Sequence, residues 1–177
     1  LFRRAFAMAK LPIVLAPDPV LKMKCEPVVS IDDDVRRLLD DMLETMYDAP
    51  GIGLSAPQVA AGQRVIVCDV AREGEAPRPY RMINPEITWR SDENVVAEEG
   101  CLSIPDYYAE VSRSREIRVG YFDPDGAAQK LDATGLLSAC IQHEIDHLNG
   151  VLFIDYLTPL KRNIILRKMK KLKRQQA

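Results

Sequence analysis

The first regular pattern along the chain is a helix between Asp32 and Ala49. Apolar residues recur there every three or four positions, Ser30 or Asp32 is suited to cap the helix, and acids occupy its first turn. Pro50 and Gly51 end the helix, and the segment GIGLSAPQ at 51–58 is typical of a loop because it contains two glycines and a proline.

Short β-branched runs follow, from residue 64 to about residue 130. The runs are RVIVCDV, EITWR and REIRVGYF, and turn segments such as EGEAPRP, SDEN and DPDG separate them. This pattern predicts antiparallel strands.

Two further helices are predicted after the strands. Thr134 is expected to cap GLLSACIQHEIDHL, whose apolar residues fall on nearly all sides and therefore indicate a buried helix, and Asn149 and Gly150 end it. Thr158 and Pro159 begin the last helix, which carries an apolar stripe opposite its lysines and arginines. The stripe consists of Leu160, Ile164, Ile165, Met169 and Leu172.

Together these elements predict an α+β fold, in which antiparallel β-sheets pack around a central buried helix with an N-terminal and a C-terminal helix outside. A chain of 177 residues that is 47% hydrophobic supports one compact domain, which we assign to 11–177. Residues 1–10 are interpreted as a leader or extension, with a vestigial organelle-targeting peptide as the alternative. No apolar run approaches the roughly 18 residues of a membrane span, so we expect no membrane partner.

Charge divides the chain into an acidic body and a basic end. Residues 161–174 contain eight of the 24 lysines and arginines and none of the 26 acids. Such a segment can bind the phosphates of an RNA or a membrane surface, or form a solvated helix face. The four cysteines are expected to be reduced thiols in a cytoplasm, because no signal peptide directs the chain to an oxidising compartment.

The only two histidines of the chain form an HExxH motif within the predicted buried helix. His143 and His147 are four residues apart, which is about one helical turn, so both imidazoles can reach one metal ion at roughly 2.0–2.1 Å. Glu144 lies beside them as a candidate acid/base. A pair of core histidines is the alternative, but burying them with Glu144 and Asp146 would be costly without partners. The motif therefore predicts a metal-dependent hydrolase.

A catalytic site of this kind needs a third protein ligand, and with no third histidine it must be Cys, Asp or Glu. Cys140 lies seven residues from His147, roughly 10 Å along a helix, which is too far. Cys68 belongs to an apolar strand and Cys25 to a polar stretch without other features. Cys101 follows a glycine in EEGCLSIP, where an irregular or edge strand can present a thiolate.

Three segments of the chain resemble, in order, the three motifs of the peptide deformylase family. They are GIGLSAPQ at 51–58, EEGCLSIP at 98–105 and QHEIDHLNG at 142–150, and the resemblance extends from about residue 17 to residue 162. It implies that the metal ligands are Cys101, His143 and His147. It further implies Glu144 as acid/base, with the Gln58 amide and the backbone N–H of Leu102 stabilising the oxyanion.

The resemblance implies that the chain removes the formyl group from the N-terminal formylmethionine of new polypeptides and releases formate. One divalent metal ion is expected. A Cys/His/His site suits Zn²⁺, Fe²⁺, Co²⁺ or Ni²⁺; the behaviour of the family favours Fe²⁺ in the cell and leaves Zn²⁺, Ni²⁺ or Co²⁺ for a purified sample. The expected location is the bacterial cytoplasm, with an organelle as the lesser alternative.

The resemblance also implies a pocket for the methionine side chain and a backbone edge for the peptide. The family's pocket positions correspond to Ile52, Ala97, Leu136, Ala139 and Cys140, which we call the methionine pocket. Many members have Ile in place of Ala97 and Ala139, so this pocket is expected to be roomier. Substrate contacts are also expected at Gly51, Ile52 and Gly53, which would pair with the peptide as an added strand, and at Gly100 and Tyr108, the latter replacing an Arg of many members.

Two other classes of function compete with this interpretation. A general HExxH metallopeptidase is disfavoured, because its usual third ligand is a His or a downstream Glu. A ribosome- or RNA-binding protein that uses the basic C-terminal helix is retained as an additional role, with residues 161–174 near the nascent-chain exit. No DNA partner is expected.

Overall fold

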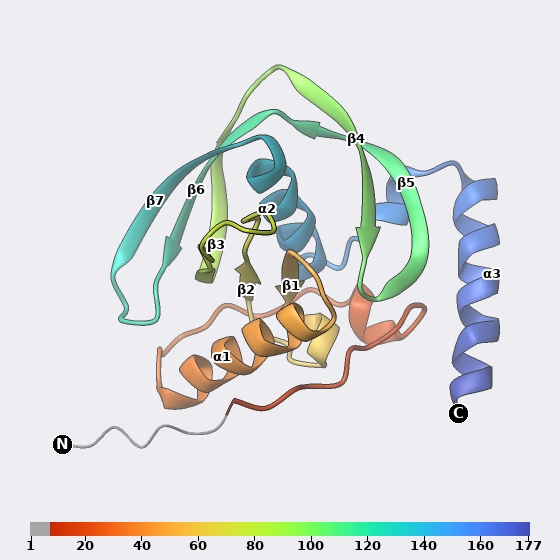
Figure 1. Ribbon diagram of the computed structural model, residues 1–177, viewed down its shortest axis with the longest axis horizontal. Coiled ribbons are helices and arrows are strands. Elements are labelled where there is room, and N and C mark those ends of the chain that lie inside the picture. Colours follow the sequence, from red (N-terminus) through yellow and green to blue (C-terminus); the bar gives the residue numbers. More distant parts are fainter. Residues whose placement is uncertain (1–7) are drawn as a thin grey trace.

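The computed structural model describes residues 8–177, so the first seven residues of the expected leader lie outside the described part of the chain. Residues 8–177 form three α-helices, two β-sheets and three 3₁₀ helices, arranged as in Figure 1. The α-helices are α1 (Asp33–Asp48), α2 (Gly135–Leu148) and α3 (Pro159–Gln176). The strands are β1 (Gly53–Ser55), β2 (Val65–Cys68), β3 (Tyr80–Arg90), β4 (Asn94–Cys101), β5 (Ile104–Ser114), β6 (Glu116–Phe122) and β7 (Ala128–Thr134). The 3₁₀ helices are η1 (Pro19–Lys22), η2 (Ala56–Val59) and η3 (Phe153–Tyr156).

Every strand pair is antiparallel, and the strands form two sheets. The larger sheet has the order β1-β2-β3-β6-β7, and β4 and β5 form a separate two-stranded ribbon. The predicted α+β class with antiparallel sheets is therefore confirmed. Because β1 pairs only with β2, its other edge is free within the described residues.

Helix α1 forms where the spacing predicted it, within one residue at each end. The Asp32 carboxylate accepts a hydrogen bond from the Val35 amide at 3.0 Å, which caps the first turn. One face of the helix is buried against β1 and β2. Its buried apolar residues are Val35, Leu39, Met42, Leu43 and Met46.

Helix α2 also forms in the predicted range, and it contacts both sheets. Thr134 is its N-cap residue, but the Thr134 side chain makes no capping hydrogen bond, so that part of the prediction was wrong. It packs on β1, β2, β6 and β7 of the larger sheet and on β5 of the ribbon. In Figure 1 the β4–β5 ribbon curves around one side of α2, with β3, β6 and β7 on the other. Most of its residues from Ser138 onward are buried, including both histidines.

Two further predictions on local structure were wrong. The segment 51–58 is not a plain loop: Gly53–Ser55 forms β1 and Ala56–Val59 forms η2. Leu54 and Ser55 are fully buried beside β2, and that pairing outweighs the turn-forming composition. The ribbon was missed for the opposite reason, because β4 is mostly exposed and lacks the apolar alternation of a half-buried strand.

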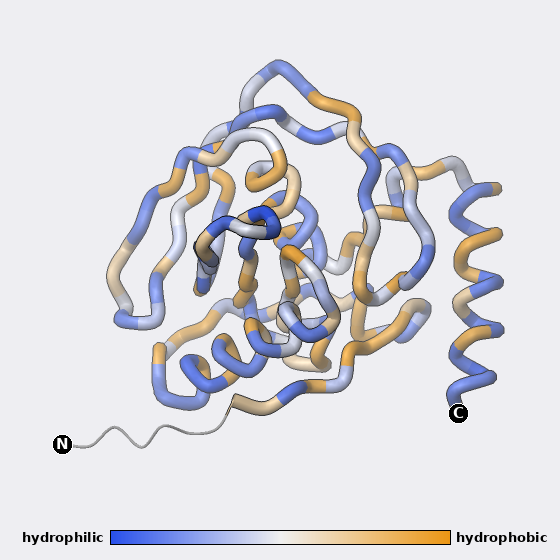
Figure 2. Tube along the Cα trace, viewed as in Figure 1, coloured by the Kyte–Doolittle hydropathy of each residue, from blue (hydrophilic) through white to orange (hydrophobic). Residues whose placement is uncertain are grey.

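The apolar stripe of the C-terminal helix is only partly buried. Ile165 and Met169 pack into the core, whereas Leu160 is 69% and Ile164 is 40% exposed. Figure 2 shows hydrophobic and hydrophilic residues alternating along α3, which lies at the side of the molecule. A helix that packs through such a narrow face leaves the rest of its stripe in solvent. None of the helices within residues 8–177 combines the length and the apolarity needed to cross a membrane.

Candidate metal centre and active site

Two elements bring three possible metal ligands to one point. His143 and His147 lie one turn apart on α2, and Cys101 is the last residue of β4. The ligand atoms of the three side chains all lie within 4.8 Å of one another, and Cys101 Sγ is 3.3 Å from His147 Nε2. One ion bound at about 2.3 Å from sulfur and 2.0–2.1 Å from nitrogen fits this spacing.

The pKa values of the two buried histidines are shifted in opposite directions. Burial alone lowers the pKa of His143, but hydrogen bonds to Cys101 and Glu99 raise it well above its ordinary value. Burial lowers the pKa of His147, and the charge of His143 lowers it further.

A tight hairpin places the thiol. β4 turns back into β5 through Leu102 and Ser103, and Cys101 pairs with Ile104 across the turn. Leu102, the residue directly after Cys101, belongs to this turn. The N-terminal segment fixes this turn, because the Ala16 amide donates to the Ser103 carbonyl at 2.9 Å.

The side chain of Gln58 is held in one orientation beside the three ligands. Its Oε1 accepts hydrogen bonds from the Ser55 amide at 3.0 Å and the Ser55 hydroxyl at 2.9 Å. Its Nε2 therefore points the other way, 3.1 Å from Ser103 Oγ and 3.5 Å from Cys101 Sγ. Gln58 is 1% exposed, so a polar donor is fixed in a nearly dry part of the site.

Glu144 is a buried acid whose protonation changes near neutral pH. Burial raises the pKa of this carboxyl to about 7, and the charge of His143 opposes part of the shift. Among residues 8–177, its Oε2 has no hydrogen-bond partner, which leaves it available for a reacting molecule. A general acid/base works best with a pKa close to the working pH.

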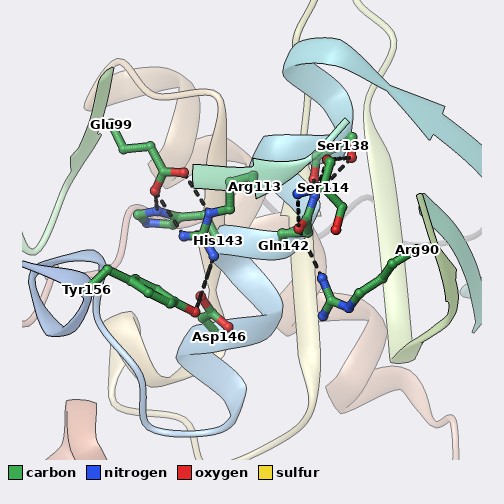
Figure 3. A network of polar contacts seen from close by, with 9 residues as sticks. All are labelled: Arg90, Glu99, Arg113, Ser114, Ser138, Gln142, His143, Asp146 and Tyr156. Carbon is green, nitrogen blue, oxygen red and sulfur yellow. Dashed lines mark hydrogen bonds and ion pairs between the residues drawn. The ribbon is translucent and has the colours of Figure 1, made fainter. Parts of the chain in front are cut away.

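A buried ion-pair network supports the ring of His143 (Figure 3). Glu99 Oε2 lies 2.9 Å from His143 Nδ1, and Arg113 binds both oxygens of Glu99, at 2.7 and 3.0 Å. A further nitrogen of Arg113 lies 2.5 Å from an oxygen of Asp146 on the next turn of α2. Although burial opposes ionisation, the bonds from Arg113 and His143 lower the pKa of Glu99 to about 2. The carboxylate therefore stays charged and holds Nδ1, which leaves Nε2 to face a metal.

A second polar network fastens the other side of α2 to the end of β5. The Gln142 amide accepts from the Ser114 amide at 3.2 Å and donates to the Ser114 carbonyl at 2.9 Å. Ser138 and Arg90 also bond to this side chain, as Figure 3 shows. Arg113 and Ser114 are consecutive, so two adjacent residues of β5 fix the helix on both sides of His143.

A cavity of about 690 Å³ opens beside the three ligands. The β1 edge, β4 and α2 all contribute to its lining, and it includes every residue expected at the substrate site. These are Gly51, Ile52, Gly53, Ala97, Gly100, Tyr108, Leu136, Ala139 and Cys140, together with Gln58, Leu102 and Glu144. The structure thus brings the expected residues together, with His147 buried behind the cavity at 1% exposure.

Several residues of the site were missed in the sequence. Glu99 stands inside the second motif, but nothing in the sequence shows which way its side chain points. Asp146 was expected to need a partner, but that partner, Arg113, lies 33 positions away and only the fold identifies it. Ser55, Ser103 and Gln142 carry no signal of their own beyond their places in or beside the motifs.

Comparison with known proteins agrees with these features. The chain matches the family described as Polypeptide deformylase over residues 10–163. It is 57% identical to a peptide deformylase of Rhizobium meliloti over 160 residues, which cover 90% of this chain and 92% of the relative. A peptide deformylase of Chromohalobacter salexigens is 56% identical over 93% of this chain and 95% of its own.

Solved structures show the same similarity. The crystal structure of peptide deformylase from Ehrlichia chaffeensis superimposes with a TM-score of 0.90 at 41% identity, covering 95% of this chain and 99% of that one. Its complex with actinonin gives a TM-score of 0.90 at 43% identity, covering 94% and 99%.

The fold and the site define a metal-dependent hydrolase with a thiolate and two imidazoles as candidate ligands. The chain belongs to the polypeptide deformylase family. It is therefore an enzyme that hydrolyses the formyl amide of formylmethionyl peptides.

Proposed function

We propose that Cys101, His143 and His147 bind the catalytic metal of this deformylase, which removes the N-formyl group from nascent polypeptides and releases formate. The observation that carries this assignment is the convergence of the three donor atoms within 4.8 Å at the wall of the cavity. Two buried polar atoms, His147 Nδ1 and Glu144 Oε2, have no hydrogen-bond partner within residues 8–177. Such atoms are rare in protein interiors and support a functional role for this site. When bound, a divalent metal would polarise carbonyl groups and lower the pKa of a bound water to about 7.

We assign the proton transfers to Glu144. Its buried carboxyl, with a pKa raised to about 7, can take a proton from the attacking water and deliver it to the leaving amine. Gln58 Nε2 and the backbone N–H of Leu102 are assigned to the oxygen on which negative charge develops. Loss of one such donor costs about 2.7–4 kcal/mol in other enzymes.

We assign the first side chain of the peptide to the methionine pocket. Its residues line the cavity, and Ala97 and Ala139 are small, so a first residue bulkier than methionine should be accepted better than by members with Ile there. The peptide backbone is assigned to the free edge of β1. The Ile52 carbonyl accepts from the Asp69 amide on the β2 side, at 2.8 Å, so the backbone groups of Gly53 face the free edge. Gly100 and Tyr108 are assigned to the opposite wall, on β4 and β5.

The metal in the cell is proposed to be Fe²⁺, with Zn²⁺, Ni²⁺ or Co²⁺ also compatible with one thiolate and two imidazoles.

We further propose a bacterial cytoplasmic location and a ribosome contact through residues 161–174 of α3. We also propose that residues 1–10 are an extension and that 11–177 form a single domain. The HExxH helix α2 would be the centre of this domain. The contacts of α2 with both sheets support it, whereas the bond from the Ala9 amide to Asp41 on α1 shows that the fold is already in contact two residues earlier.

The test is formate release from formyl-Met-Ala-Ser by the anaerobically purified, iron-loaded enzyme, beside a Glu144→Ala variant with the same metal content. We expect activity in the parent and its collapse in the variant. Unformylated Met-Ala-Ser is the control for a general metallopeptidase, and its cleavage would favour that function instead. A variant that keeps parental kcat with full metal content would remove Glu144 from the mechanism.

A further inference from the structure

Tyr156, the last residue of η3, makes three contacts with the ion-pair network although its side chain is half exposed. Its hydroxyl donates to Asp146 Oδ2 at 2.7 Å and accepts from Arg113 Nη1 at 3.5 Å, and its ring lies under the Arg113 guanidinium, whose Cζ is 5.0 Å from the ring centroid. Tyr156 is 53% exposed, so part of its side chain faces solvent. Its hydroxyl group points toward Asp146 at one end of the network (Figure 3).

A continuous series of bonds connects this tyrosine to a candidate metal ligand. The Asp146 oxygen that accepts from Tyr156 also binds Arg113, and the Glu99 oxygen that binds His143 Nδ1 also binds Arg113. Arg113 is only 7% exposed, so water cannot readily replace a partner that its guanidinium loses. A displacement of Arg113 therefore changes the position of Glu99 and with it the ring of His143.

The same short helix supports His143 a second time. Phe153, the first residue of η3, is 1% exposed, and its ring is stacked on the His143 ring at 6.2 Å between centroids and 26° between planes. η3 thus contacts the ring directly through Phe153 and the network behind it through Tyr156. Two independent contacts from four consecutive residues indicate that η3 holds this ligand in place.

We propose that Tyr156 is a positioning residue for His143, acting through Asp146, Arg113 and Glu99. The proposal rests on the assignment of His143 as a metal ligand. Tyr156 touches neither the cavity nor the three ligands; it covers one face of the Arg113 guanidinium and fixes the Asp146 oxygen that Arg113 needs. Residues that orient a ligand in this indirect way change metal affinity about 10–100-fold when removed.

The experiment compares the metal-loaded full-length parent with Tyr156→Ala and Tyr156→Phe. Release of Zn²⁺ to a chromogenic chelator and the visible absorption of the Co²⁺-loaded protein are measured, because a purely structural role would not move them. We expect Tyr156→Ala to speed Zn²⁺ release about 10-fold and to alter the Co²⁺ spectrum. Tyr156→Phe keeps the ring under Arg113 and should give a smaller change.

Tyr121→Ala is the matched control. This tyrosine of β6 is partly buried against the apolar core between the larger sheet and α2, which contains no residue of the ion-pair network. It should lower the melting temperature without changing either metal readout. Zn²⁺ release and a Co²⁺ spectrum that stay parental in Tyr156→Ala would overturn the proposal, even if the melting temperature falls. Metal binding that is insensitive to Cys101→Ser in the parent would overturn the proposed metal site and this inference with it.

The route through Glu99 is tested with Tyr156→Ala in a Glu99→Gln background. If Tyr156 acts through Glu99, it should speed metal release less in this background than in the parent, because the step that transmits its effect is already weakened. Fully additive effects on the logarithm of the release rate would overturn the route.

Discussion

Gly53 is the residue at which the expected peptide edge touches the acid/base. A Cβ on this glycine would lie 2.5 Å from Glu144 Oε1 and 2.8 Å from Cys140 Sγ, closer than real contacts allow. β1 and α2 can therefore approach this closely only because residue 53 has no side chain. The same absence keeps the floor of the cavity open beside the carboxylate.

Gly53→Ala should consequently lower kcat while leaving the metal ligands in place. The added methyl group displaces the Glu144 carboxylate or the β1 edge, and a misplacement of about 1 Å can cost roughly 10²-fold in rate. The measurement is kcat for formate release, with metal content and melting temperature determined on the same samples.

Gly62→Ala is the control for this substitution, because a Cβ there meets nothing within 4 Å. It should keep parental kcat. If Gly53→Ala also keeps parental kcat at full metal content, Glu144 does not depend on this close contact.

At the scale of elements, the parts predicted from the sequence are those whose signals are local. The ends of α2 follow from Thr134 before it and Asn149 after it, and its spacing alone places the two histidines on one side. β4 could not be predicted in the same way, because its residues are mostly exposed and it is a strand only through pairing with β5. The ion pair between Glu99 and Arg113 also depends on how β4 pairs with β5, so it could not be predicted from the sequence either.

Asp69, directly after β2, joins three elements near the substrate edge. Its carboxylate accepts from the Tyr47 hydroxyl at 2.5 Å, from the Ala71 amide at 2.9 Å and from the Arg78 amide at 3.0 Å. Its own amide holds the Ile52 carbonyl. The end of α1, the approach to β1 and both ends of the loop between β2 and β3 thus meet at one buried carboxylate.

Asp69→Asn should destabilise the enzyme at neutral pH by about 1–3 kcal/mol, because an amide can serve only part of these donors. Burial raises the pKa of Asp69, but the three bonds lower it below its ordinary value. A lowered pKa stabilises the fold above the unfolded value of about 3.9 and loses that effect as the pH falls through the folded value. The difference in melting temperature between parent and variant should therefore be steady from pH 7 to 5 and shrink below pH 4.

Thermal unfolding across this pH range measures the difference. Asp125→Asn, on the exposed turn after β6, changes the same charge and should show almost no difference at any pH. A gap between parent and Asp69→Asn that stays constant down to pH 3 would show that the charge of Asp69 is not what holds these elements together.

At the scale of the whole molecule, α3 contributes no residue to the cavity lining, although its Lys168 lies 5.5 Å from the ring of Tyr107, which does line the cavity. Its buried residues Ile165 and Met169 anchor it in the core. Leu166 and Leu172 pack beside them, and Lys173 forms an ion pair with Asp18 at 3.0 Å, while the helix itself lies at the side of the molecule (Figure 1). The acidic body and the basic helix therefore present two different surfaces. The proposed ribosome contact would use the basic residues of α3, none of which lines the cavity.

Lys161, Arg167 and Lys171 are exposed on α3, and replacing all three with Gln should weaken ribosome binding while deformylation of a short peptide stays parental. Each lost phosphate contact should reduce the slope of log K against log salt by about 0.7–0.9. Co-sedimentation with ribosomes over a series of salt concentrations measures both the affinity and the slope.

A variant with Arg72, Arg78 and Lys130 changed to Gln has the same net charge but carries its changes in the loop after β2 and on β7. If α3 is the binding surface, this control should keep the parental affinity and slope, since only charges near the phosphates release counterions. Equal weakening in both variants would mean that ribosome binding follows the overall charge of the enzyme. Binding that does not change with salt would contradict a phosphate contact altogether, and α3 would then be a solvated helix whose charges keep it at the surface.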